Sequence, residues 1–261
     1  MYGEYPPASS GNGSDWPETS GRYDRPVRFT AKNQVGRTAG IVLAASVPLV
    51  LLGNALILLL VPWTADVLYA LPGFPGDPLG LAGEDRSALA EVGIRSIWPV
   101  GEGTALLQEA QLPDGSAAFQ PKETNHMADV SGFVRTGLTL WLVALVAGAV
   151  ATLALRRVDP RWIRASLGTG ARIALFSMLA VALVMVIGFE FFFDSFHAIF
   201  FEGDSWRFAD YFTLRRIYPD AFWGIAAGVF VLLALAQALL LAHLTTGLPR
   251  PGSVPRAQTD Q

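Results

Sequence analysis

The stretch IALFSMLAVALVMVIGFEFFF, residues 173–193, decides the fold class of this chain. Glu190 is its single charged residue, and its length matches the ~20 apolar residues that a helix needs to cross about 30 Å of hydrocarbon. The apolar residues run continuously instead of alternating, which favours a helix over a strand of a membrane barrel. A helix also satisfies its own backbone hydrogen bonds in lipid. We therefore expect a transmembrane helix here.

Three more stretches of this kind predict three more membrane helices, at about residues 39–61, 137–155 and 221–242. Of the 261 residues, 52% are hydrophobic and only 16% are charged, and the charged residues avoid these three windows. The sequence therefore predicts an all-α membrane protein with four transmembrane helices. Asn54 lies inside the first window, where its amide is expected to find a partner on another helix. Cysteine is absent, which excludes disulfides and thiolate chemistry.

The distribution of basic residues sets the orientation that we expect. They gather before the first helix and between the second and third helices, whereas residues 62–136 carry four basic residues against ten acidic ones. Because positively charged segments stay in the cytoplasm, residues 62–136 are expected outside and both termini inside. Topology accounts for the basic residues, so we expect no nucleic-acid partner. The two basic clusters are Arg22, Arg25, Arg28, Lys32 and Arg37, and Arg156, Arg157, Arg161, Arg164 and Arg172.

The chain is expected to divide into three parts. Residues 1–37 begin with a region rich in Gly, Pro and Ser that cannot bury enough apolar surface to fold, so we expect a disordered cytoplasmic tail. Residues 38–243 form the four-helix membrane domain. Residues 244–261 are expected to form a flexible cytoplasmic tail.

The extracytoplasmic segment, residues 62–136, is too long for a plain connector, so we expect it to form a small ordered cap. Residues 84–98 have the spacing of a short amphipathic helix. Residues 104–119 predict two short extended pieces around a Pro-Asp-Gly turn. Thr124 or Asn125 is the expected N-cap of a helix that runs into the second membrane helix.

Ionisable residues gather at the outer end of the third helix. If that helix continues past Phe193, then Glu190, Asp194 and His197 share one helical face. Carboxylates at this spacing can orient an imidazole, and a charged residue inside an apolar run is a functional candidate. The same stretch is also typical of an aromatic belt at a membrane edge, with carboxylates that reach water. Both interpretations stay open at this point.

A second histidine lies on the same expected side of the membrane. His126 and Asp129 form a pair at i and i+3 before the second membrane helix. Because imidazole suits proton transfer near neutral pH, His126 and His197 could form one acid/base site. The alternative is a metal site, in which Asp129 and Asp194 join the two histidines as ligands. His243, the third histidine, is expected at the cytoplasmic boundary.

Two motifs around these histidines carry a resemblance to a known family. They are HMADV at residues 126–130 and FHAIFFEGDSWRF at residues 196–208. Further matches follow at Leu214, at Tyr218-Pro219 and at Phe222-Trp223. Over roughly residues 38–243 the chain resembles a family of four-span bacterial integral membrane proteins that includes the lipoprotein intramolecular transacylases. It departs from the family pattern at Phe212, where an aspartate is usual, and at Arg215, where an aliphatic residue is common.

The resemblance implies a specific reaction at the outer face of the bacterial plasma membrane. The sn-2 acyl chain of a diacylglyceryl-modified lipoprotein would move to the α-amino group of its N-terminal cysteine. Membrane lipids and such lipoproteins are the partners that this implies, and no cofactor or metal is expected. A metal-dependent membrane hydrolase and a non-catalytic envelope or assembly protein are the alternatives that we keep.

The resemblance also assigns expected roles to residues of this chain. His126 and His197 would be catalytic, one as general base and the other as acid or oxyanion stabiliser. Carboxylates would support and orient the imidazoles, and aromatic residues would face lipid or substrate. The expected supporting residues are Asp129, Asp194, Asp204 and Glu190, and the expected lipid- or substrate-facing residues are Phe200, Phe201, Trp206, Phe208 and Trp223.

Overall fold

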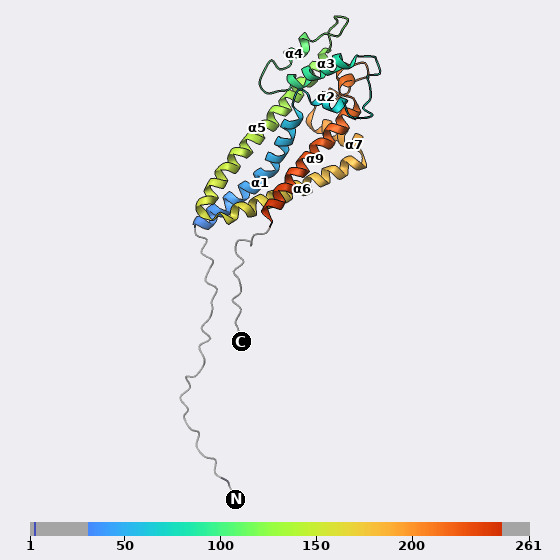
Figure 1. Ribbon diagram of the computed structural model, residues 1–261. Coiled ribbons are helices and arrows are strands. Elements are labelled where there is room, and N and C mark those ends of the chain that lie inside the picture. Colours follow the sequence, from blue (N-terminus) through green and yellow to red (C-terminus); the bar gives the residue numbers. More distant parts are fainter. Residues whose placement is uncertain (1–2, 4–30, 247–261) are drawn as a thin grey trace.

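The computed structural model describes residue 3 and residues 31–246, and the described chain is helical (Figure 1). Four of its helices are long and apolar enough to cross a membrane, which confirms the all-α fold class. The only strand-like pairing in this part of the chain is one bridge between Gln111 and Ala117. The helices are α1 (Ala31–Leu59), α2 (Thr64–Tyr69), α3 (Gly83–Ser96), α4 (Ala105–Glu109), α5 (Pro121–Val158), α6 (Arg161–Ile187), α7 (Phe189–Phe200), α8 (Thr213–Ile217) and α9 (Asp220–Thr245).

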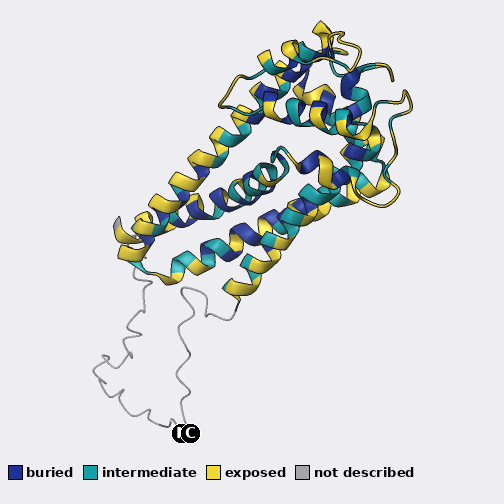
Figure 2. Cartoon of the chain, turned by 45° about the horizontal axis from the view of Figure 1, so that its top comes forward, coloured by how far each residue is buried: buried dark blue, intermediate teal, exposed yellow. Residues whose placement is uncertain are grey.

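Helix α1 lies inside the bundle and packs against α5, α6 and α9. The short helices lie at one end of the bundle, and at the other end α1 begins and α9 ends (Figure 1). The long helices turn exposed residues outward along their lengths (Figure 2). Those residues include large apolar side chains such as Leu142, Phe176 and Leu232. An apolar outer surface of this kind suits a bundle surrounded by lipid.

Small residues and one polar network hold α1 in place. A Cβ added at Gly53 would lie 2.2 Å from the Trp141 side chain, so glycine is what allows α1 and α5 to approach this closely. The adjacent Asn54 donates from Nδ2 to Gln237 Oε1 on α9 at 3.0 Å. Its Oδ1 accepts from Trp141 Nε1 on α5 at 3.0 Å. The expectation that Asn54 pairs with another helix is confirmed.

Helix α5 begins at Pro121, well before the expected residue 137. The start is fixed by a capping box, in which the Gln120 N–H donates to Glu123 Oε2 at 2.7 Å. The expected N-cap at Thr124 or Asn125 is therefore wrong, because both residues lie inside the first turns of the helix. At ~1.5 Å per residue, the 38 residues of α5 span about 57 Å, so the helix extends well beyond the ~30 Å hydrocarbon layer.

The third long helix also differs from its expected range of 173–193. Helix α6 starts earlier, at Arg161, and ends at Ile187. Gly188 has φ −168° and ψ 89°, which breaks the helix, and the chain continues as the separate helix α7 (Figure 1). Glu190 consequently lies outside the membrane-crossing helix, on α7, with an exposed side chain.

The first and last helices extend into the ranges that were expected to form the two tails. Residues 31–37 belong to α1, and residues 244–245 belong to α9. The remainder of the expected tails, apart from residue 3 and residue 246, lies outside the described residues.

The cap is an ordered unit packed around α3. Helix α3 covers most of the expected range 84–98, whereas residues 105–109 form α4 instead of an extended piece. Arg86 is buried and donates to the backbone carbonyls of Arg216 (3.0 Å) and Pro75 (2.8 Å). Arg216 forms a 2.9 Å ion pair with Asp77. Burial opposes ionisation of Asp77, but the hydrogen bonds from Arg216 and the Leu81 N–H hold its pKa below the usual range.

Candidate functional site

His126 on the long helix α5 and His197 on the short helix α7 lie side by side. Their ring centroids lie 6.3 Å apart, and their exposed fractions are only 8% and 9%. His126 comes from the second turn of α5, in the part that the capping box adds to the membrane helix. His197 comes from α7, which the break at Gly188 turns away from α6. The sequence left open whether the two histidines meet, and the structure brings their rings together, whereas their catalytic roles stay predictions.

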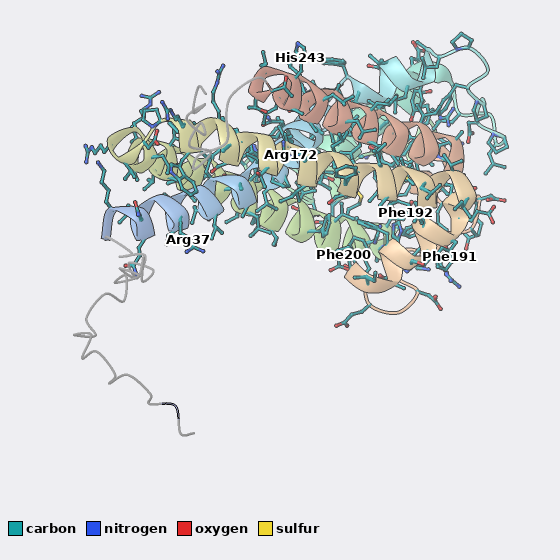
Figure 3. The ribbon with its side chains drawn as sticks, turned by 90° about the horizontal axis from the view of Figure 1, so that it is seen from below. Arg37, Arg172, Phe191, Phe192, Phe200 and His243 are labelled. Atoms are coloured by element: carbon teal, nitrogen blue, oxygen red, sulfur yellow. The ribbon has the colours of Figure 1, made fainter. Side chains whose placement is uncertain are left out.

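Helix α7 presents two different faces. His197 is buried on one face, whereas Phe191 and Ile199 are 72% and 74% exposed on the other. Figure 3 shows Phe191 and Phe200 on α7 at one end of the view and Arg37 on α1 at the other. An amphipathic helix with aromatic residues on its outer face is typical of a membrane interface. The two interpretations of this stretch are therefore compatible, because α7 carries both a membrane edge and a buried histidine.

Aromatic rings enclose the two imidazoles. The ring of His126 lies 5.1 Å from Phe201 and 5.5 Å from Phe208. The ring of His197 lies 4.1 Å from Phe193 and 4.6 Å from Trp206. Such an enclosure limits hydration of a positive charge, which disfavours the imidazolium form.

The hydrogen bond of His197 defines its tautomer. Its Nδ1 lies 2.8 Å from the carbonyl oxygen of Phe193. Because a carbonyl oxygen only accepts, Nδ1 carries the proton and the lone pair of a neutral ring is on Nε2. Burial lowers the pKa of His197, and this outweighs the opposing effects of the Phe193 carbonyl and the Asp194 charge. His197 is therefore a neutral imidazole at neutral pH with Nε2 available as a base.

Three buried side-chain polar atoms in the His126 ring and in the loop after α7 lack a hydrogen-bond partner. They are His126 Nδ1, Ser205 Oγ and Trp206 Nε1, and no other buried side-chain nitrogen or oxygen in the described chain shares this property. A buried polar group without a partner costs about 1–3 kcal/mol. The rings of His126 and Trp206 both lie near the ring of His197, so a molecule bound there could supply partners to two of these atoms.

The four carboxylates that were expected to orient the imidazoles lie at the protein surface. Asp194 and Asp204 both approach Arg207, at 3.7 Å and 3.5 Å, and all three side chains are exposed. Asp129 and Glu190 are exposed as well. Within the described residues no carboxylate hydrogen-bonds to either imidazole. Direct orientation of the rings by these four carboxylates is therefore not observed, and Asp194 acts on His197 only through its charge.

The ligand set of the alternative metal site does not come together. In residues 31–246 no group of three or more His, Asp or Glu side chains has an arrangement that could hold a metal ion. Asp129 points to the surface and Asp194 is engaged with Arg207, so neither joins the two imidazoles.

The aromatic residues expected to face lipid or substrate separate into two groups. Phe200 and Trp223 are exposed. Phe201 is buried against His126, and Trp206 and Phe208 are half-buried beside the two imidazoles. Three of the five therefore line the histidine site. Arg215, one of the two departures from the family pattern, pairs with Asp220 and Asp210 at the surface.

Glu123 is a supporting residue that sequence reasoning missed. Its side chain is fully buried one turn before His126. While Oε2 caps α5, Oε1 accepts from the Leu214 N–H at 2.7 Å. Glu123 thus ties the start of α5 to α8, which follows the loop carrying Trp206. The available signal was the Gln120-Pro121-x-Glu123 spacing, which has the form of a capping box.

Comparison with known proteins agrees with this geometry. Residues 105–223 match the family model described as "Lipoprotein intramolecular transacylase Lit", and this region contains both histidines and Glu123. The resemblance to the Lit family is confirmed. A relative from Aquifex aeolicus (strain VF5), described as an uncharacterized protein, is 29% identical to this chain over 155 residues, which are 59% of this chain and 68% of the relative.

The fold is that of Lit. The structure of the membrane integral lipoprotein intramolecular transacylase Lit from Bacillus cereus matches with a TM-score of 0.64 at 16% identity, covering 81% of this chain and 94% of that chain. A variant of that protein with a histidine-to-alanine mutation matches with a TM-score of 0.61 at 17% identity, covering 82% and 93%. The match includes most of both chains, so the four long helices and the cap together are the shared architecture.

Proposed function

We propose that this protein is a Lit-like lipoprotein intramolecular transacylase of the bacterial plasma membrane. Its substrate is a lipoprotein with a diacylglyceryl group on its N-terminal cysteine, and the reaction moves the sn-2 acyl chain to the cysteine α-amino group. The observation that carries the proposal is the pair of buried imidazoles, 6.3 Å apart, within the Lit-matching region. We also propose that the site faces the extracytoplasmic side, as the basic residues predict.

The reaction needs a base, an acid and donors for an oxyanion. The amine lone pair attacks the ester carbonyl carbon, and His197 Nε2 takes a proton from the nitrogen. The tetrahedral intermediate then collapses, the ester C–O bond breaks, and the protonated His197 returns its proton to the departing glyceryl oxygen, while neutral His126 donates a hydrogen bond to the oxyanion. The free Nε2 of His197, whose Nδ1–H is held by the Phe193 carbonyl, supports its role as the base. The substrate holds both reacting groups, so the enzyme gains much of the rate from their orientation.

The unpartnered atoms fit the remaining requirement. Trp206 Nε1 and Ser205 Oγ are donors without a partner, and the indole of Trp206 lies 4.6 Å from the His197 ring. We assign them to the carbonyl oxygen as it becomes negative. Removing one such donor typically lowers kcat by about 10²–10³.

The substrate's acyl chains can reach the site from the bilayer. Val186 and Ile187 at the end of α6 are 85% and 78% exposed, and they adjoin the exposed aromatic face of α7. This continuous apolar surface suits hydrocarbon chains. It lies on the helix that carries His197 and on the end of α6 that precedes it.

The experiment is co-expression with a tagged diacylglyceryl lipoprotein, followed by tandem mass spectrometry of its N-terminal peptide. The transfer is an isomerisation, so the intact mass stays constant and the fragment ions locate the acyl chain. We expect an N-acylated cysteine with the wild-type protein, and a free amine with His126→Ala or His197→Ala. A free amine with the wild-type protein would refute the proposed activity.

A further inference from the structure

A groove on the other side of α5 lies apart from the histidine site. It has a volume of about 300 Å³ between the end of α1, the loop after α3 and α5. Arg135 is nine residues after His126, and at ~100° per residue this places the two side chains on opposite sides of α5. The groove therefore faces away from the imidazoles. Its lining residues are Ile57, Trp98, Pro99, Arg135, Leu138, Thr139, Trp141 and Leu142.

The walls of the groove offer almost no free polar atom. Trp98 Nε1 donates to the Leu60 carbonyl at 2.7 Å, and Trp141 Nε1 donates to Asn54 Oδ1 at 3.0 Å. The Thr139 hydroxyl donates to the Arg135 carbonyl at 2.8 Å. These bonds also fix the two indoles in place. The groove is a preformed apolar wall with one remaining polar group, the guanidinium of Arg135.

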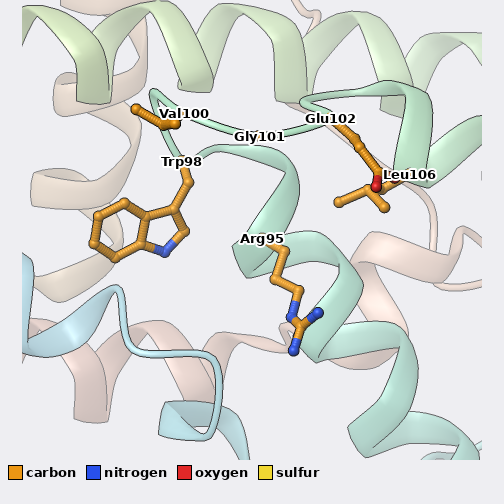
Figure 4. A pocket seen from close by; sticks show the side chains of 6 residues that line it. All are labelled: Arg95, Trp98, Val100, Gly101, Glu102 and Leu106. Carbon is orange, nitrogen blue, oxygen red and sulfur yellow. The ribbon is translucent and has the colours of Figure 1, made fainter.

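That guanidinium has no partner among the described residues, since no carboxylate lies within ion-pair distance of it. A neighbouring hollow of about 240 Å³ on the cap side shares Trp98 and provides a contrast (Figure 4). Its arginine, Arg95, forms a 2.6 Å ion pair with Glu91. Of the two arginines, only Arg135 presents an uncompensated charge to a groove.

Arg135 also lies at a defined depth. The 20 residues between it and Arg156 carry no charge, and at ~1.5 Å each they cover about 30 Å, the thickness of the hydrocarbon layer. Arg135 and Arg156 thus mark the two edges of the membrane on α5. The Arg135 guanidinium is at headgroup level, and Leu138 and Leu142 continue from it into the hydrocarbon.

We propose that this groove binds one anionic phospholipid of the bilayer, with its phosphate on Arg135 and an acyl chain along Leu138, Leu142 and Ile57. A guanidinium matches the oxygens of a phosphate and forms charge-assisted hydrogen bonds with them. The apolar wall below the charge complements a hydrocarbon chain. A bound lipid would contact α1, the Trp98 loop and α5 together, at the base of the α5 extension that carries His126. The proposal is independent of the transacylase activity.

The test is native mass spectrometry of the full-length protein released from micelles that contain equal amounts of phosphatidylglycerol and phosphatidylcholine. The wild-type protein is expected to retain one phosphatidylglycerol in preference to phosphatidylcholine. Arg135→Gln should lower the affinity for phosphatidylglycerol by about tenfold, to the level of phosphatidylcholine. Arg95→Gln is the matched control, because it removes a paired arginine outside the groove, and it should retain the wild-type preference.

A second variant tests the groove itself. Leu138→Trp fills the apolar wall while it keeps Arg135, and it should lose the bound lipid although the charge remains. The proposal is overturned if the wild-type protein has no preference for phosphatidylglycerol, or if both Arg135→Gln and Leu138→Trp bind it as the wild type does. Glycerol phosphate added in excess should not displace the lipid, because it lacks the chain that fills the groove. Displacement by it would overturn the acyl part of the proposal.

Discussion

The substitution Trp206→Phe separates a catalytic role of this indole from a packing role. Phenylalanine keeps an aromatic ring at the position of the indole, which lies 4.6 Å from His197, but removes the indole N–H, which has no partner. Loss of an oxyanion donor should lower kcat by about 10²–10³, equivalent to about 2.7–4 kcal/mol of transition-state stabilisation. The substrate binds mainly through its acyl chains, so KM should change little.

The same substitution should have a small effect on stability, because two terms oppose each other. Removing a buried donor that lacks a partner relieves a penalty of about 1–3 kcal/mol. The smaller ring gives up apolar contact worth a similar amount. We therefore expect the free energy of unfolding in detergent to change by less than about 1 kcal/mol, while kcat falls steeply.

The assay follows the rate of N-acylation of a synthetic diacylglyceryl peptide in mixed micelles, with thermal unfolding measured on the same samples. Trp162→Phe is the matched control, since Trp162 packs against Leu43, Ala151 and Leu155 away from the histidines. It should leave kcat unchanged. If Trp206→Phe retains wild-type kcat, or if its kcat falls only in proportion to a loss of folded protein, the assignment of Trp206 as a donor is refuted.

Three further predictions concern pH, capping and packing. Burial lowers the pKa of His197 in the folded protein below its ordinary value of about 6.5. The stability that the neutral imidazole contributes is therefore complete above pH about 6.5 and is lost as pH falls through the lower pKa of the folded state. In this acidic range the unfolding temperature of the wild type should drop more than that of His197→Asn. Glu123→Gln replaces the carboxylate that accepts from the Gln120 and Leu214 N–H groups by an amide with a single acceptor oxygen. It should destabilise the protein by about 2–3 kcal/mol, measured by denaturant unfolding in detergent. An unchanged free energy of unfolding would contradict the proposed connection between α5 and α8. Gly53→Ala places a Cβ 2.2 Å from an indole and should cost about 1–3 kcal/mol in the same measurement, whereas Gly224→Ala, with open space around its Cβ, should cost nothing.

The sequence predicted the four membrane helices well because hydrocarbon thickness imposes a strong and local pattern. It predicted helix ends poorly where other forces decide them. The start of α5 depends on a capping box formed by Gln120 and Glu123, which lies outside the apolar window. The end of α6 depends on the backbone of Gly188, and nothing in the hydropathy of residues 173–193 marks that break.

The sequence singled out the two histidines whose rings lie together, and it missed most of their surroundings. Helical spacing brings His126 and Asp129 to within reach of each other, but α7 and its following loop draw the imidazole toward aromatic rings and leave Asp129 exposed. Spacing along one helix defines possible neighbours, whereas packing between helices selects among them. Trp206 illustrates the same limit, because its indole belongs to the aromatic belt by composition and to the histidine site by packing.

The central claim is that His126 and His197 act together in one reaction. A double-mutant cycle tests it directly, with N-acylation rates measured for wild type, His126→Ala, His197→Ala and the variant that carries both changes. Residues that act as a unit give non-additive losses, so we predict that the double variant is about as slow as the slower single variant. Losses that multiply, so that the double variant is slower by the product of the two single effects, would contradict a shared site.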